Sequence, residues 1–117
     1  MNWIDVVIIL NSTTHDGSTA TVTGEKFKGD GYYGRADGLH TVAYHLTGFA
    51  GIIKMQATLS TDPTSSDWFD VAGTAVGDGS TVLTENTFKN FTGNFMWVRV
   101  AITDFAAGTV SKVLYNN

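Results

Sequence analysis

The chain has 117 residues, 43% of them hydrophobic and 12% aromatic, which fits one globular domain and excludes a disordered chain. It contains no cysteine, so thiol catalysis, zinc ribbons and disulfide frameworks are excluded. A net charge of −4 without any basic run argues against nucleic acid or an anionic membrane as the partner.

The amino-terminal part predicts short strands separated by polar turns. Residues 6–9 are four consecutive β-branched side chains, which favours a strand buried on both faces. The apolar run around them, residues 3–10, is too short to cross a bilayer and is interrupted by Asp5, so we expect neither a membrane span nor a signal peptide. Residues 19–23 can form a short strand, and the glycine-rich segment 29–38 is expected to be a loop.

The clearest alternation of apolar and polar residues lies in two segments, 39–47 and 52–59. Side chains of a strand point to opposite faces in turn, so each segment is expected to have one buried face. The side chains expected on the buried faces are His40, Val42, Tyr44, Leu46, Ile53, Met55, Ala57 and Leu59. The glycines of segment 48–51 are expected to reverse the chain between the two strands.

The carboxyl-terminal part continues the same pattern. Residues 61–66 form a polar loop with the only proline, after which residues 68–71 are expected to be a returning strand. Residues 76–86 indicate a looser turn with at most a short strand. Residues 95–102 carry the strongest strand pattern, and residues 109–115 complete the chain as a last strand. The inward side chains of the strongest strand are expected to be Met96, Val98, Val100 and Ile102.

Seven or eight short strands separated by glycine turns predict an all-β fold, a small antiparallel β-sandwich of jelly-roll-like or immunoglobulin-like type. We expect a single domain, in which residues 29–117 form the core sandwich. Residues 1–28 are expected to add strands and a turn, or an arm that lies at an interface. The first and last strands are the natural edges of the sheets, and their sparse charge suggests that a neighbouring chain covers one or both.

Polar residues do not point to a catalytic, cofactor or metal site. His40 and His45 are five residues apart on a predicted strand, so they leave opposite faces and cannot share a metal. We expect these two and His15 to make ordinary hydrogen bonds. The aspartates lie mainly in turns, where a carboxylate usually bonds its own backbone, with calcium binding as a minor alternative. The sequence thus predicts a protein that is not an enzyme and needs no cofactor.

Aromatic side chains are the main candidates for a binding surface. Trp97 and Arg99 lie on the face opposite an apolar row, and Trp68 follows a polar loop. A tryptophan in such a place can cover its own sheet, anchor a protein interface or stack on a sugar ring. The candidate interface or ligand-stacking residues are Trp3, Tyr32, Trp68, Trp97 and Arg99.

A series of short strings from residue 29 to the carboxyl end resembles a known family. The strings are GYYG at 31–34, DGLHTV at 37–42, GFAG at 48–51, QATL at 56–59, DPT at 62–64, DWF at 67–69 and FTGNFMWVRV at 91–100. Together they resemble small β-rich virion structural proteins of tailed phages, particularly those that infect marine cyanobacteria.

This resemblance implies a non-enzymatic virion structural protein, located in the virion as a head-decoration or tail-associated module. Such a module would dock on capsid or tail proteins as a homo-oligomer, with a trimer as one option. The resemblance carries no catalytic residues. The alternative is a carbohydrate-binding or receptor-binding tail-fibre module, in which Trp97, Trp68 or Tyr32 stacks on a glycan. A small hydrolase ranks last, because its nucleophile and base cannot be assigned.

Overall fold

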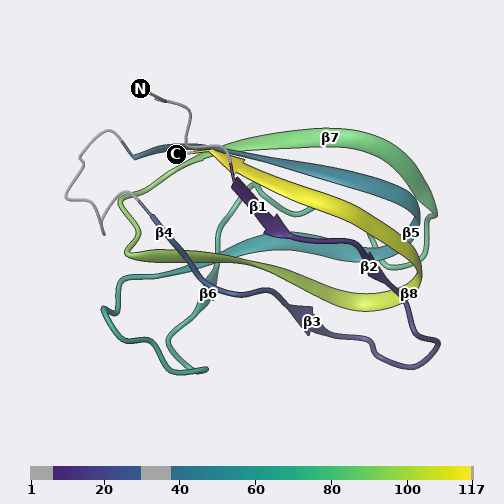
Figure 1. Ribbon diagram of the computed structural model, residues 1–117, viewed down its shortest axis with the longest axis horizontal. Helices are drawn as coiled ribbons and strands as arrows, with labels where there is room; N and C mark the ends of the chain where they lie inside the picture. Colours follow the sequence, from purple (N-terminus) through teal and green to yellow (C-terminus); the bar gives the residue numbers. More distant parts are fainter. Residues whose placement is uncertain (1–6, 30–37, 117) are drawn as a thin grey trace.

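The computed structural model describes residues 7–29 and 38–116, which form a body of 40 × 33 × 22 Å (Figure 1). Every regular element in this part of the chain is a β-strand. The strands are β1 (Val7–Leu10), β2 (Thr13–Thr14), β3 (Val22–Thr23), β4 (Phe27–Lys28), β5 (Leu39–Thr58), β6 (Phe69–Asp70), β7 (Leu83–Thr92) and β8 (Trp97–Asn116). All of them pair antiparallel within one open, eight-stranded sheet. The all-β, antiparallel prediction is therefore confirmed.

The two long strands β5 and β8 form the centre of the sheet. They pair along almost their full length, from Thr41 opposite Asn116 to Thr58 opposite Trp97. Both strands run out from one end of the molecule, turn and come back, so the sheet has two halves (Figure 1). In the first half, β1 and β2 flank β8 and β7 flanks β5. In the second half, β3 and β4 flank β8 and β6 flanks β5.

Glycine and phenylalanine together make the bend possible. Gly48 in β5 and Gly108 in β8 have positive φ angles of 59° and 89°, a conformation that residues with a Cβ rarely adopt. A Cβ on Gly108 would also overlap the carbonyl oxygen of Gly48. Inside the bend, Phe49 and Phe105 are buried with ring centroids 5.5 Å apart. The predicted reversal at 48–51 is thus a bend within one continuous strand.

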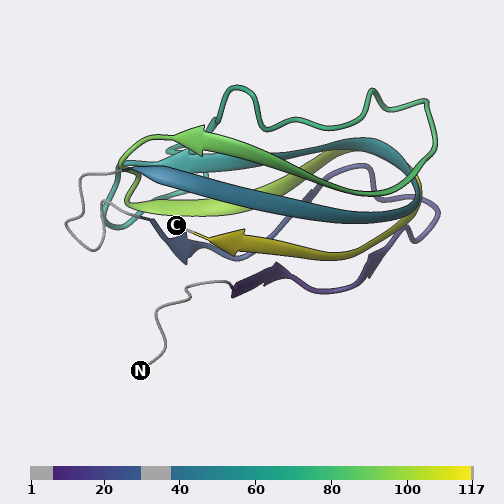
Figure 2. The same cartoon turned by 90° about the horizontal axis from the view of Figure 1, so that it is seen from above.

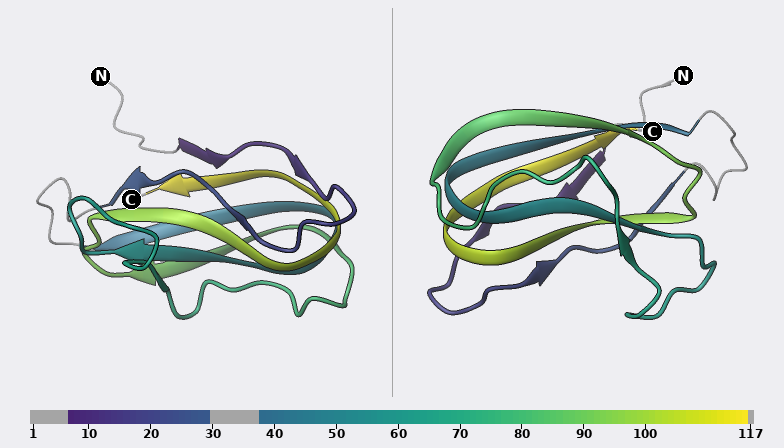
Figure 3. Two further views of the ribbon diagram at one scale, coloured as in Figure 1. Left: turned by 90° about the horizontal axis from the view of Figure 1, so that it is seen from below. Right: turned by 180° about the vertical axis from the view of Figure 1, so that it is seen from behind.

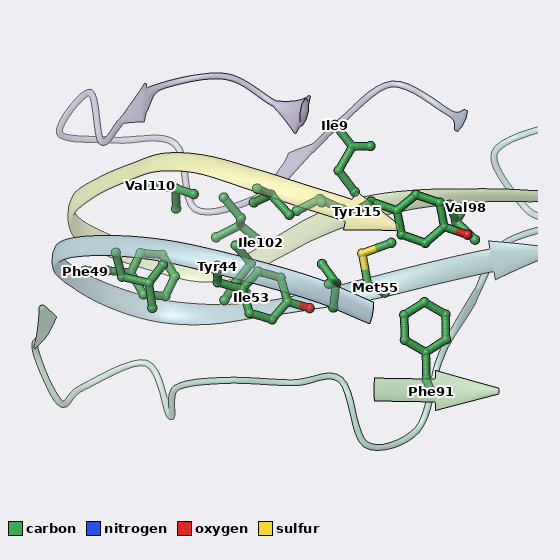
Figure 4. Packing of buried hydrophobic residues seen from close by; sticks show 14 of the residues in the cluster. Ile9, Tyr44, Phe49, Ile53, Met55, Phe91, Val98, Ile102, Val110 and Tyr115 are labelled. Carbon is green, nitrogen blue, oxygen red and sulfur yellow. The ribbon is translucent and has the colours of Figure 1, made fainter. Parts of the chain in front are cut away.

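One hydrophobic core lies between the two halves of the sheet (Figure 4). The predicted alternation explains it, because the side chains of β5 and β8 at every second position point inward. The inward residues confirmed as fully buried are His40, Val42, Tyr44, Leu46, Ile53, Met55, Ala57, Val98, Val100 and Ile102. Leu59 was expected in this set, but it is 67% exposed because β5 ends at Thr58.

The amino-terminal residues line one edge of the sheet. β1, β2, β3 and β4 all pair with β8, on the side of the molecule opposite the connection between β6 and β7 (Figures 2 and 3). The prediction that residues 6–9 are buried on both faces is wrong for the described part, since Ile9 is buried but Ile8 is 50% exposed. The reason is position: within the described residues β1 pairs with β8 alone, so it covers the core with one face.

Three further expectations differ from the structure. The strands belong to one continuous open sheet, and neither a sandwich of two separate sheets nor a jelly roll is shown. The last strand, β8, is not an edge, because β5 lies on one side of it and β1–β4 on the other. The segment 76–86 was expected to be mostly turn, yet β7 begins at Leu83 and runs for ten residues. Most side chains of β7 are polar and exposed, so its sequence lacks the alternation of apolar and polar residues that predicts a strand.

Candidate functional site

The candidate surface lies on the second half of the sheet, on the face turned away from the core. Trp97 and Arg99 alternate along β8 with Val98 and Val100, which are buried, so they leave the opposite face. Gln56 lies directly opposite Arg99 on the neighbouring strand β5. Cross-strand neighbours of this kind have their side chains within contact distance.

A chain of polar contacts runs across three strands of this surface. The Arg99 Nε donates to Gln56 Oε1 at 2.9 Å, and Gln56 Nε2 donates to Asp70 Oδ1 at 2.9 Å. The other carboxylate oxygen of Asp70 accepts from Lys54 Nζ at 2.9 Å. Gln56 therefore connects a cation on β8 to a carboxylate on β6, and each of its amide atoms has a partner.

These contacts change the protonation behaviour of two groups. Hydrogen bonds from Gln56 and Lys54 hold the pKa of Asp70 below its ordinary value, because they favour the ionised carboxylate. Partial burial lowers the pKa of Arg99, although a guanidinium remains charged in any protein. The surface thus carries fixed charges near neutral pH.

Both tryptophans of the surface contact a cation. The guanidinium carbon of Arg99 lies 4.3 Å from the ring centroid of Trp68, and Lys26 Nζ lies 4.8 Å from the ring centroid of Trp97. The indole nitrogen of Trp97 also donates to the carbonyl oxygen of Thr61 at 3.0 Å. This bond ties the polar loop after β5 to the first residue of β8.

The structure brings three of the five predicted surface residues together. Trp68, Trp97 and Arg99 are half-buried on one face, although Trp68 is 29 positions before Trp97 in the sequence. The other two, Trp3 and Tyr32, lie outside the described residues.

The polar members of this surface could not be predicted from the sequence. Gln56 and Lys54 had the right alternation to face away from the core, but nothing in the sequence showed which strand lies beside them. Asp70 and Lys26 come from β6 and from the segment before β4, whose places are set by sheet pairing. With the pairing known, Lys54 contacts the Asp70 carboxylate, and Arg99 and Lys26 each contact a tryptophan ring of the same surface.

Two of the three histidines make the hydrogen bonds expected of them, His40 in the core and His15 with the backbone nitrogen of Gly17. His40 is fully buried and stacks on Phe91, with ring centroids 4.7 Å apart. Its Nε2 lies 2.6 Å from the carbonyl oxygen of Gly93 and its Nδ1 lies 2.7 Å from the hydroxyl of Tyr115. His45 is on the opposite face of β5, which confirms that the two histidines cannot share a metal.

Turn aspartates also behave as predicted where the structure describes their bonds. In the identical tetrapeptides DGST at 16–19 and 78–81, the aspartate carboxylate accepts from the backbone nitrogens two and three residues later.

Among the described residues, no group of three or more histidine, cysteine, aspartate or glutamate side chains could hold a metal ion. No helix in the same part of the chain is long and apolar enough to cross a membrane.

Comparison with known proteins finds a solved structure with a similar fold. The sequence matches no family model and no curated protein. Among solved structures, the crystal structure of the SPBc2 prophage-derived protein YomS is similar, with a TM-score of 0.53 and 18% sequence identity. The chain shares the fold of a prophage-derived protein. The match covers 99% of this chain and 96% of that chain, so the likeness extends over the whole fold.

Proposed function

We propose that the chain is a non-enzymatic structural protein of a phage virion, which docks on capsid or tail proteins as a head-decoration or tail-associated module. The observation that carries this proposal is the full-length fold likeness to a prophage-derived protein. The resemblance of its sequence strings to virion proteins of tailed phages supports the same conclusion.

The surface around Arg99 is suited to docking. Arg99 and Trp68 are residue types that commonly anchor protein interfaces, and here each holds the other in place. Because Gln56 fixes the guanidinium through its Nε, the side chain loses little freedom when a partner binds. An acidic or carbonyl-rich patch on the neighbouring virion protein would fit the remaining guanidinium donors.

Mass spectrometry and cryo-electron microscopy of purified particles test this proposal directly. We expect the chain in the particle at a stoichiometry that follows the lattice symmetry. Particles produced with Arg99→Ala should contain less of the chain, whereas the matched variant Lys112→Ala, on the other half of the sheet, should be incorporated normally. Absence of the wild-type chain from the particle would end the proposal.

A carbohydrate-binding or receptor-binding tail-fibre module is the second candidate, because Trp68 and Trp97 share one face. A sugar ring would have to compete with the cations that already contact both indoles, which is why this function ranks second. Glycan-array binding that is lost in Trp97→Ala but kept in Ile8→Ala, an exposed hydrophobic residue on the other half of the sheet, would favour it. Silence on all host surface glycans would count against it.

A further inference from the structure

The strand β7 forms a long, continuous edge of the sheet. In the described part of the chain, β7 pairs with β5 alone, in an unbroken register from Leu39 opposite Thr92 to Leu46 opposite Glu85. The amino-terminal edge differs, because it is divided among strands of two to four residues. Short strands protect an edge from further pairing, whereas β7 contains no proline and its register with β5 shifts near its start, between Leu83 and Glu85.

The sequence of β7 is complementary to itself in the antiparallel direction. If two copies of the strand pair about a two-fold axis at Thr87, Glu85 of each copy lies directly opposite Lys89 of the other. Residues 85 and 89 are both on the core side of the strand, since they pair with the inward-facing Leu46 and Val42 of β5. Among the described residues, neither Glu85 nor Lys89 has an ion pair or a side-chain hydrogen bond of its own.

The other face of β7 fits the same arrangement. Phe88 is 61% exposed and points away from the core, opposite Ala43. About an axis at Thr87, the two copies of Phe88 are diagonal neighbours, at a separation that aromatic side chains can bridge. On the core side, a groove of about 370 Å³ lies between Glu85, Thr87 and Lys89 of β7 and the segment 75–81, and it has room for side chains of the second copy.

We infer that a second copy of this chain binds at β7, extending the sheet through an antiparallel β7–β7 pair with two Glu85–Lys89 ion pairs. The interface is isologous, so it gives a two-fold dimer and not a ring of three. The dimer does not depend on the proposed virion role. A monomeric chain could be part of a particle, and a chain that is absent from the particle could still form the dimer.

Sedimentation analysis of the full chain at about 1 to 100 μM tests the inference. We expect a reversible dimer for the wild type. Glu85→Lys and Lys89→Glu each turn both ion pairs into like-charge pairs and should raise the Kd roughly 30-fold. The double variant E85K/K89E restores opposite charges and should return the Kd to near the wild-type value. A mixture of the two single variants should form a heterodimer, detected by native mass spectrometry.

Matched charge changes away from β7 provide the controls. Glu25→Lys and Lys112→Glu carry the same changes of charge on other strands or loops and should leave the dimer intact. Circular dichroism confirms that each variant is folded. A wild-type chain that stays monomeric over the whole range, single variants that dimerise like the wild type, or a mixture without heterodimer would each overturn the inference.

Discussion

Removing the hydroxyl of Tyr115 should destabilise the protein, because a buried histidine depends on it. The carbonyl of Gly93 can only accept, so Nε2 of His40 donates to it, and in a neutral ring Nδ1 accepts from Tyr115. Both residues are buried, at 0% and 2% exposure, so water cannot replace the lost donor. Tyr115→Phe keeps the aromatic stack on His40 and leaves one buried nitrogen without that partner.

An unsatisfied buried group of this kind costs about 2 kcal/mol in the free energy of unfolding. For a chain of this length, that corresponds to a fall in Tm of roughly 8 °C. Urea denaturation and calorimetry of Tyr115→Phe measure both quantities. The control is Thr41→Val, which removes a surface bond from the next residue of β5, to Asn90 at 2.8 Å, and should cost less than about 0.5 kcal/mol. If Tyr115→Phe is as stable as the control, packing alone holds His40.

Two further predictions concern the bend and a turn. Gly108→Ala should lower the free energy of unfolding by more than about 2 kcal/mol, because it combines a positive φ with a clash against Gly48. Gly17→Ala has the positive φ without the clash, so thermal unfolding should show a smaller loss, and equal losses in the two variants would refute the clash. Hydrogen bonds from the backbone of the turn lower the pKa of Asp78 from 3.8 to about 2, so the stabilising effect of its carboxylate is complete above pH 4 and is lost as the pH falls towards 2. Titration of the carboxyl carbon by NMR should show this value, and a midpoint near 3.8 would mean that the bonds do not persist.

The candidate surface shows how far local sequence patterns reach. Trp97 and Arg99 could be placed on one face because they are two residues apart in a strand, and that inference needs only the geometry of a single strand. Trp68 and Asp70 could not be placed on the same face from the sequence. They lie about thirty residues before Trp97 and Arg99, and they come close to them only because β6 pairs with β5. The strand β7, of which the sequence indicated at most a short piece, has the same cause: its polar side chains are stabilised by the neighbouring strand, whose paired residues lie 34 to 53 positions earlier.

The sequence by itself determined the all-β class, the buried faces of β5 and β8, the burial of His40 and the bonds of the turn aspartates. Each of these follows from the two-residue period of a strand or from bonds within a few residues, whereas the partners of His40 come from distant strands. Only the tertiary structure decided that β8 is central, that the sheet is one piece bent at Gly48 and Gly108, and that β7 is an open edge. Strand order depends on which distant segments exchange backbone hydrogen bonds, and backbone groups are the same in every residue except proline.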